Sequence, residues 1–489
     1  MLELVVFLCG AVVMVIELAA SRVLAPYLGT STIVWTSIIG IILGALSLGY
    51  WWGGRLADRR PTAKALSAVI LAAAAATGLI GFSRSFVAEM IRASGGGLHA
   101  SSLLSVVVLF APAAVLLGMV SPFAARIRLT GSESAGRTVG RLYALSTLGS
   151  IVGTFAGGFF LISFFGSATI LFLMAAVLAV ASIICHAGRW TGKAGLAAIC
   201  LTLSLVFASG TGSAVSGGVT DVDTDYQRVL VYRTINHASG REMLAMSTGP
   251  EGVQGGVFPD EPGALALTYT QFLTLAPHFA PDMRRVLVLG GGSYAFPKFV
   301  LANHPEATVD VVELDPGITA LAREHFNLKD DARLKIIHQD ARTFLNANKE
   351  RYDVIVADVF NSSASIPFHL TTVETAARMA DALKDGGVLL VNAIVALEGP
   401  KSRLYKSFFA TYSRVFPQVH PVRCWIDSQP GEPSNVILVC FKTDGPRSWT
   451  SPDPDQRRKL SHRIPAPDTG GAAVLTDEFA PVERLMTRW

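Results

Sequence analysis

The sequence predicts two bodies: an α-helical membrane bundle of about seven spans, then an α/β domain of the Rossmann-like class preceded by a small β-domain. Composition is the first observation behind this prediction, because hydrophobic residues make up 51% of the chain and charged residues only 16%. Soluble chains carry about 25% charged residues, and here the apolar excess lies almost wholly before residue 211. The second observation is the alternation of strands and helices from residue 286 onward, which favours a parallel sheet.

These shifts in composition predict the domain boundaries. We expect a transmembrane helical domain over residues 1–210, a Gly/Ser/Thr-rich linker over 211–220, a small β-domain over 221–262, the Rossmann-like domain over 263–445 and a C-terminal tail over 446–489.

Seven segments have or approach the roughly 20 apolar residues that a helix needs to cross the hydrocarbon of a bilayer. They are residues 2–20, 33–52, 65–82, 101–121, 142–165, 168–187 and 194–210. The first lacks a basic n-region and a cleavage site, and Glu17 and Arg22 at its end fit a retained helix better than a signal peptide. In the fifth, Gly149, Gly153, Gly157 and Gly158 predict close approach of helix backbones.

Lysines and arginines in the short loops predict the orientation of these spans. They are concentrated after the second, fourth and sixth segments, which puts the amino terminus in the cytoplasm. If the seventh segment spans, the C-terminal domain emerges on the outer side. If that segment is re-entrant or lies along the interface, the domain stays in the cytoplasm, and the sequence leaves both open.

Glycines and acidic residues follow the expected parallel strands. The strand VLVLG runs into Gly290, Gly291 and Gly292, and the next strands end near Glu313, Asp340 and Asp358. The carboxyl ends of parallel strands form the edge where open α/β sheets bind ligands. We therefore expect these side chains to share one site.

The chemistry of this set predicts a nucleoside ligand. Glycines let the backbone approach a ligand without an intervening Cβ, and an acidic residue about 20 positions on, Glu313, suits two ribose hydroxyls. Asp340 suits an adenine amino group. The run GGGSYAFPK lacks the third glycine of a dinucleotide motif, so we expect an S-adenosylmethionine-type nucleoside rather than a dinucleotide.

At this point the sequence resembles the spermidine synthase (aminopropyltransferase) family in its membrane-fused, multi-pass form. The resemblance covers about residues 221–445, and ELAASRVLAPYLGTSTIVWTS in the apolar half is also similar. The ordered motifs are Tyr226-Gln227, STGPEGVQ ending at Gln254, Asp260-Glu261 with Tyr269, GGGSYA, VELD, HQDAR and DVFNS.

The resemblance implies decarboxylated S-adenosylmethionine as co-substrate, with no permanently bound cofactor, and a diamine such as putrescine as acceptor. It implies spermidine and methylthioadenosine as products. It assigns Asp358 as the catalytic carboxylate and places Gln227 near the aminopropyl arm of the donor. The amine side would contain Gln254, Tyr269, Ser293 and Asn361.

Two of these positions depart from the family pattern. Ser293 and Asn361 stand where the family has aspartates around the amine channel, so attraction for a dication is weakened. We expect either a different amine or a carboxylate from elsewhere, and Asp477 or Glu478 of the tail is a candidate beside the alternative of a solvated acidic tail.

Other functions stay open at this point. One alternative is a small-molecule methyltransferase, and another is a transporter or sensor that binds nucleoside or polyamine without turnover. The resemblance favours a bacterial inner membrane protein in the lipid bilayer, and a homodimer. The net charge of +4 is not gathered into one stripe, so we expect no nucleic-acid partner.

The cysteines indicate no metal site. Cys9, Cys185, Cys200, Cys424 and Cys440 lack ligand spacing. Cys424 and Cys440 fall on expected neighbouring strands, 421–427 and 435–442, and we expect two buried thiols rather than a disulfide.

Overall fold

The computed structural model describes residues 1–29, 31–93, 97–129, 135–185, 218–224, 226–249, 252–359, 366–425 and 429–486. Contacts divide the chain into two units. A helical unit comprises residues 1–216 with 220–228, and a sheet unit comprises residues 217–219 with 229–489.

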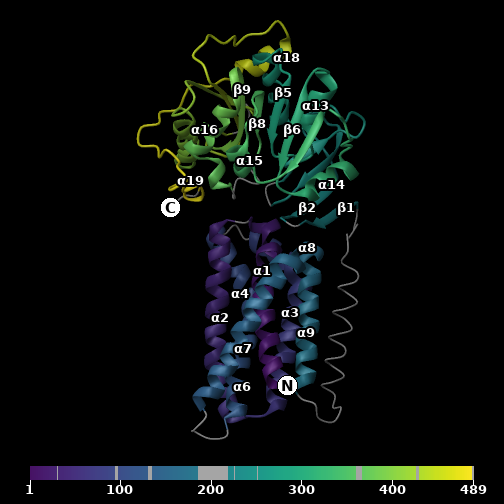
Figure 1. The fold of residues 1–489 in the computed structure, drawn as a ribbon, viewed down its shortest axis with the longest axis vertical. Helices are drawn as coiled ribbons and strands as arrows, with labels where there is room; N and C mark the ends of the chain where they lie inside the picture. The colour runs from purple at the N-terminus through teal and green to yellow at the C-terminus, as the bar shows by residue number, and fades with distance from the viewer. Residues whose placement is uncertain are drawn as a thin grey trace. The chain divides into compact units, whose positions relative to one another are not determined.

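The helical unit consists of helices that run side by side (Figure 1). They are α1 (Leu2–Leu28), α2 (Thr32–Arg59), α3 (Ala63–Ala93), α4 (Leu98–Leu109), α5 (Ala111–Gly118), α6 (Val120–Arg128), α7 (Ala135–Ala156), the π-helical turn η1 (Gly157–Leu161), α8 (Ile162–Phe164) and α9 (Ser167–Cys185). Within the described residues, five helices are long and apolar enough to cross a membrane, or six if the bent pair Leu98–Leu109 and Ala111–Arg128 is one span. The expected seventh span, 194–210, lies outside the described residues, so a seven-span bundle stays a prediction.

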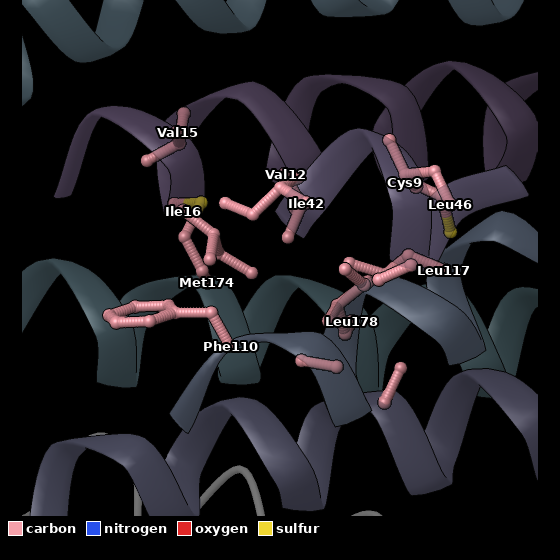
Figure 2. Packing of buried hydrophobic residues seen from close by; sticks show 14 of the residues in the cluster. Cys9, Val12, Val15, Ile16, Ile42, Leu46, Phe110, Leu117, Met174 and Leu178 are labelled. Carbon is pink, nitrogen blue, oxygen red and sulfur yellow. The ribbon is translucent and has the colours of Figure 1, made fainter. Parts of the chain in front are cut away.

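The core of the helical unit is mainly apolar, with buried serines such as Ser67 and Ser182 hydrogen-bonded to each other. Figure 2 shows side chains of α1, α2 and α9 meeting in it, among them Val12, Ile42 and Leu178. Glycines of α7 let it approach α1 closely, because a Cβ at Gly149 would lie 2.0 Å from the carbonyl oxygen of Phe7. The close backbone approach predicted for this span is confirmed at Gly149.

A short antiparallel sheet begins the sheet unit. Strand β2 (Arg228–Ile235) pairs with β3 (Glu242–Ser247), and β3 pairs with β4 (Gly255–Val257). Strand β1 (Val219–Asp223) comes before them, and most of it groups with the helical unit.

The larger sheet has the strand order β10-β11-β9-β8-β5-β6-β7. Its strands are β5 (Arg285–Leu289), β6 (Thr308–Glu313), β7 (Leu334–His338), β8 (Tyr352–Ala357), β9 (Leu383–Val395), β10 (Gln418–Arg423) and β11 (Ser434–Phe441). The five strands β5 to β9 run parallel to one another. Strand β11 pairs antiparallel with β9, and β10 pairs antiparallel with β11. From β5 the chain goes outward through β6 and β7, then returns to place β8 on the other side of β5. The strand order thus reverses between β5 and β8, where open sheets of this kind bind ligands.

Helices cover both faces of this sheet (Figure 1). Alternate residues of β5 belong to different cores, since Leu287 packs with one set of helices and Val288 with the other. The Leu287 face carries α15 (Ala341–Ala347), α16 (Val373–Ala382), α17 (Arg403–Tyr412) and α19 (Val482–Met486). The Val288 face carries α11 (Thr268–Phe272), α12 (Leu275–Phe279), α13 (Ala295–Asn303), α14 (Pro316–His325) and α18 (Pro454–Ser461). Burial on both faces explains why these strands read as continuous apolar runs.

One predicted strand is displaced. The expected strand over 421–427 is β10, which begins at Gln418 and ends at Arg423 because it pairs from Gln418↔Phe441 to Arg423↔Val436. Pro421 is tolerated because β10 is an edge strand. Cys440 lies opposite Val419, and both Cys424 and Cys440 are buried free thiols, as predicted.

Candidate active site

The first residue of the turn after β5, Gly290, has to be a glycine. Gly290 has a φ of +93°, and a Cβ there would lie 2.3 Å from the carbonyl oxygen of Asp358. Its N–H donates to the carbonyl of Val312 at 2.9 Å. The turn therefore contacts the ends of both neighbouring strands, β6 and β8.

Gly290→Ala is expected to lower the melting temperature and to abolish nucleoside binding. The substitution adds both left-handed strain of about 1–2 kcal/mol and the clash with Asp358. Gly386→Ala is the matched control, because its φ is +84° but a Cβ there would meet no atom within 4 Å. Calorimetry and titration with methylthioadenosine measure both effects. Equal losses of stability in the two variants would contradict the steric role of Gly290.

The next glycine is fixed by an aromatic ring. Tyr294 adopts a left-handed conformation (φ 54°) ahead of α13 and is fully buried. Its ring would lie 2.6 Å from a Cβ at Gly291, and its hydroxyl hydrogen-bonds Thr319 at 2.7 Å. The ring thus packs under the turn and excludes a side chain at Gly291.

Glu313 ends β6 and reaches back to this turn. Its carboxylate accepts hydrogen bonds from the N–H of Gly291 at 2.7 Å and of Asp315 at 2.9 Å. The residue is only 9% exposed. Burial raises its pKa, and the backbone hydrogen bonds act in the opposite direction. Glu313 is therefore a fixed acceptor beside the glycine turn.

Asp358 follows β8 directly next to the glycine turn, and its N–H donates to Leu289 at 2.9 Å. One carboxylate oxygen accepts from the hydroxyl of Tyr269 at 3.0 Å, and the other from the amide of Asn392 at 2.8 Å. Burial raises its pKa, whereas the bonds from Asn392 and Tyr269 lower it. Because a carboxylate offers about four lone-pair sites, both oxygens can still accept another donor.

The amide of Asn392 is itself oriented. It lies on β9, and its Oδ1 accepts a hydrogen bond from Asn435 of β11 at 3.0 Å. The chain of contacts Asn435–Asn392–Asp358–Tyr269 therefore fixes the rotamer of Asp358.

Asp340 lies further along the same sheet edge, after β7. It caps α15 by accepting from the N–H of Thr343 at 2.8 Å, and its other oxygen lies 3.2 Å from Nε2 of His369. Burial alone would raise its pKa, but the bonds from Thr343 and His369 outweigh it and lower the pKa. Asp340 is therefore an ionised, partly exposed acceptor.

Of the residues predicted for the amine side, the structure describes Gln254, Tyr269 and Ser293. The carbonyl oxygen of Gln254 lies 3.2 Å from the Tyr269 hydroxyl, while the Gln254 side chain accepts from the N–H of Thr248 at 3.0 Å. Ser293 is buried, and its Cβ lies 3.1 Å from the ideal Cβ position of Gly255. Asn361 lies outside the described residues.

Gln227 lies in the helical unit, in the turn after β1. Its carbonyl accepts from the N–H and the hydroxyl of Thr224, both at 2.8 Å. Its predicted role at the donor stays a prediction.

The carboxylate of the tail residue Asp477 is engaged by neighbouring side chains. Its carboxylate accepts from Arg342 at 2.6 Å and from the hydroxyl of Thr372 at 2.7 Å. The carboxylate that we considered as a substitute amine ligand therefore accepts hydrogen bonds from an arginine and a threonine. Glu478 beside it is exposed.

Two residues of the site did not emerge from the sequence. Asn392 is the single polar residue inside the apolar run VLLVNAIV, which is a usable signal because buried polar groups need partners. His369 lies in the short helical turn η2 (Phe368–Leu370), and no spacing links it to Asp340.

Comparisons with known proteins bear on this geometry. Residues 267–443 match the family described as spermine/spermidine synthase domain. The chain is 26% identical over 225 residues to a polyamine aminopropyltransferase of Vibrio vulnificus, which covers 45% of this chain and 71% of that protein. It is 27% identical over 511 residues to polyamine aminopropyltransferase 2 of Streptomyces coelicolor, which covers 98% of this chain and 85% of that protein.

Among solved structures, a probable spermidine synthase from Corynebacterium glutamicum is 22% identical, with a TM-score of 0.43, covering 52% of this chain and 95% of that one. The match to the family covers β5 to β11 and hence the strand ends that carry Glu313, Asp340 and Asp358. The chain therefore carries a spermine/spermidine synthase domain, is a homologue of the polyamine aminopropyltransferases, and is an enzyme of that class.

Proposed function

We propose that this aminopropyltransferase is held in a bilayer by its apolar helices and transfers the aminopropyl group of decarboxylated S-adenosylmethionine to a diamine such as putrescine. The products are spermidine and methylthioadenosine. The observation that carries the proposal is Asp358, a carboxylate that follows β8 next to the glycine turn and accepts one hydrogen bond on each oxygen.

The donor lies along the edge of the parallel strands. Glu313 accepts hydrogen bonds from the ribose hydroxyls, Asp340 accepts one from the adenine amino group, and Gly290, Gly291 and Gly292 allow close approach of the backbone. The sequence motif that contains Gln227 predicts that this residue lies near the aminopropyl arm. The N–H bonds that fix the carboxylate of Glu313 support its role, because they leave its remaining lone pairs in a defined direction.

The reaction needs a neutral amine. The acceptor is an ammonium ion at neutral pH, so Asp358 first orients it and then accepts its proton. The nitrogen lone pair forms a bond to the aminopropyl carbon attached to sulfur, while the C–S bond breaks and its electrons neutralise the sulfonium. Because the sulfonium is a good leaving group, positioning of the two substrates supplies much of the remaining acceleration.

The acceptor side is weakly charged. Gln254, Tyr269, Ser293 and Asn361 are neutral, so Asp358 is the carboxylate that attracts the reacting end of the amine. The far end of the acceptor then finds no carboxylate at Ser293 or Asn361. We therefore expect weaker discrimination between diamines of different length than two further carboxylates would give.

Tyr269→Phe is expected to move the acidic limb of the pH profile of kcat/KM to higher pH. The Tyr269 hydroxyl stabilises the ionised form of Asp358, which is the active form, so its removal raises the pKa of Asp358 further. Activity is then lost at a higher pH as the solution is acidified. Tyr143→Phe, the same chemical change at an exposed tyrosine of α7, is the control and should leave the limb in place. An unchanged limb in Tyr269→Phe would contradict the role of Asp358 as proton acceptor.

The proposed organisation follows the sequence. A transmembrane domain over residues 1–210 and a linker over 211–220 lead into the β-domain, 221–262, the catalytic domain, 263–445, and the tail, 446–489. The apolar helices support placement in a bacterial inner membrane, and we further propose a homodimer.

The nucleoside product tests the type of transfer. Purified protein in detergent would be given either decarboxylated S-adenosylmethionine or S-adenosylmethionine, with putrescine, and the nucleosides separated by chromatography. Methylthioadenosine from the decarboxylated donor alone is the expected result. S-adenosylhomocysteine from the other donor would show a methyltransferase instead. If neither nucleoside is formed, the proposed enzymatic activity is contradicted.

A further inference from the structure

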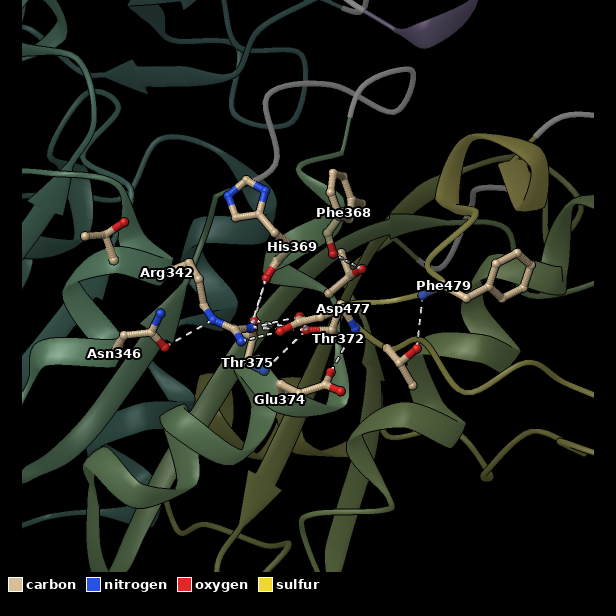
Figure 3. A network of polar contacts seen from close by, with 12 residues as sticks. Arg342, Asn346, Phe368, His369, Thr372, Glu374, Thr375, Asp477 and Phe479 are labelled. Carbon is tan, nitrogen blue, oxygen red and sulfur yellow. Dashed lines mark hydrogen bonds and ion pairs between the residues drawn. The ribbon is translucent and has the colours of Figure 1, made fainter.

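The C-terminal tail meets the predicted adenine side of the site through Arg342. This arginine lies in the first turn of α15, two residues after Asp340. Its guanidinium donates to both oxygens of Asp477, at 3.2 Å and 2.6 Å. Figure 3 shows Arg342 extending between Thr375 and Asp477. Its side chain is only 16% exposed, so this bidentate pair is partly shielded from solvent.

The same guanidinium holds the backbone of His369 through Thr375. Nη1 of Arg342 donates to the hydroxyl of Thr375, and that hydroxyl donates to the His369 carbonyl at 2.5 Å. The imidazole of His369 lies 3.2 Å from Asp340. Because an ionised carboxylate only accepts hydrogen bonds, Nε2 of His369 is the donor. The path from the tail to the site is therefore Asp477, Arg342, Thr375, His369 and Asp340.

The tail itself is anchored on both sides of Asp477. Leu475 is fully buried, its N–H donates to Thr411 at 2.9 Å, and its carbonyl accepts from the N–H of Val373 at 2.9 Å. The N–H of Asp477 donates to Glu374 at 3.0 Å. Thr476 and Phe479 exchange backbone hydrogen bonds in a closed turn. Asp477 is thus presented by a rigid segment that lies 135 residues from Arg342 in sequence.

We propose that Asp477 is a positioning residue for the nucleoside site, acting through Arg342 to hold His369 against Asp340. This inference rests on the proposed role of Asp340 as the adenine acceptor. Without Asp477, Arg342 loses its charged partner, and the Thr375 hydroxyl that donates to the His369 carbonyl loses its oriented neighbour. Asp340 keeps its bond from Thr343 but loses a fixed donor on its other oxygen. The expected consequence is weaker donor binding with little change in the transfer step.

The test compares Asp477→Asn with Asp330→Asn in the full-length protein. Asp477→Asn keeps the volume and removes the charge, and Asp330→Asn makes the same chemical change at a residue that is 92% exposed. We expect Asp477→Asn to raise the Kd for methylthioadenosine and the KM for the donor about tenfold. The kcat and the KM for the amine should stay within about twofold, and Asp330→Asn should match the wild type.

Rescue separates positioning from loss of folding. Asp477→Glu keeps a negative charge opposite Arg342, and we expect this variant to retain most of the donor affinity. Melting temperatures show whether each variant is folded. A folded Asp477→Asn protein with unchanged affinity for methylthioadenosine would overturn the positioning role, as would equal losses in kcat and in the KM for both substrates. Wild-type protein that binds methylthioadenosine but transfers no aminopropyl group would contradict the proposed function and leave the role of Asp477 testable. That role is decided by the affinities of the variants for methylthioadenosine, which do not depend on turnover.

Discussion

Asp358→Asn is expected to lower kcat by about a thousandfold, while the Kd for methylthioadenosine stays within about threefold. The carboxylate is the proposed proton acceptor, and an amide of the same shape cannot take the proton from the acceptor ammonium. Asparagine also presents an NH2 group to Tyr269 or Asn392, each of which donates to the present carboxylate. Single-turnover rates with saturating donor measure the loss directly.

The control for this change is Asp330→Asn. Asp330 is 92% exposed and pairs with Arg323 on the surface, so the same chemical substitution there should leave kcat and binding unchanged. A rate for Asp358→Asn within tenfold of the wild type would contradict a proton transfer through Asp358.

Glu313→Ala is expected to raise the Kd for methylthioadenosine by about a hundredfold or more. The variant loses the acceptor for the ribose hydroxyls and leaves the N–H groups of Gly291 and Asp315 without their present partner. Each unpaired buried N–H costs about 1–3 kcal/mol, so the melting temperature should also fall. Calorimetric titration with methylthioadenosine and thermal unfolding measure the two effects.

Glu313→Asp distinguishes binding from folding. The shorter side chain keeps the charge but moves it away from the turn, so affinity should fall by about tenfold with a smaller loss of stability. Unchanged affinity in both variants, with the proteins folded, would show that Glu313 holds no part of the ligand.

Much of the catalytic fold could be predicted because the strands are buried on both faces. The apolar runs of β5, β6 and β8 are easy to find, whereas β7 is an edge strand whose residues are half-buried or exposed. Glycines or acidic residues follow these strands, and both residue types bind ligands at the carboxyl ends of parallel strands. The acidic residues were predicted to meet at one edge, and parallel pairing of β8, β5, β6 and β7 places their strand ends together.

The partners of those residues could not be predicted, because they come from sequence-distant elements. Asn392 reaches Asp358 only because β9 pairs with β8, and the register between them shifts near Tyr352. His369 and Arg342 depend on a short turn and a tail that carry no periodic pattern. The Asp477 carboxylate, considered as an amine ligand, is bound by Arg342 instead, a pairing that charge alone does not specify.

The most direct test of the central claim is mass spectrometry of the amine products. Wild-type protein would be incubated with decarboxylated S-adenosylmethionine and a panel of putrescine, cadaverine and spermidine, beside Asp358→Asn. We predict an aminopropylated amine, spermidine from putrescine, that appears with wild-type protein and disappears with the variant. Wild-type protein that binds methylthioadenosine but yields no aminopropylated product from any amine would contradict the account.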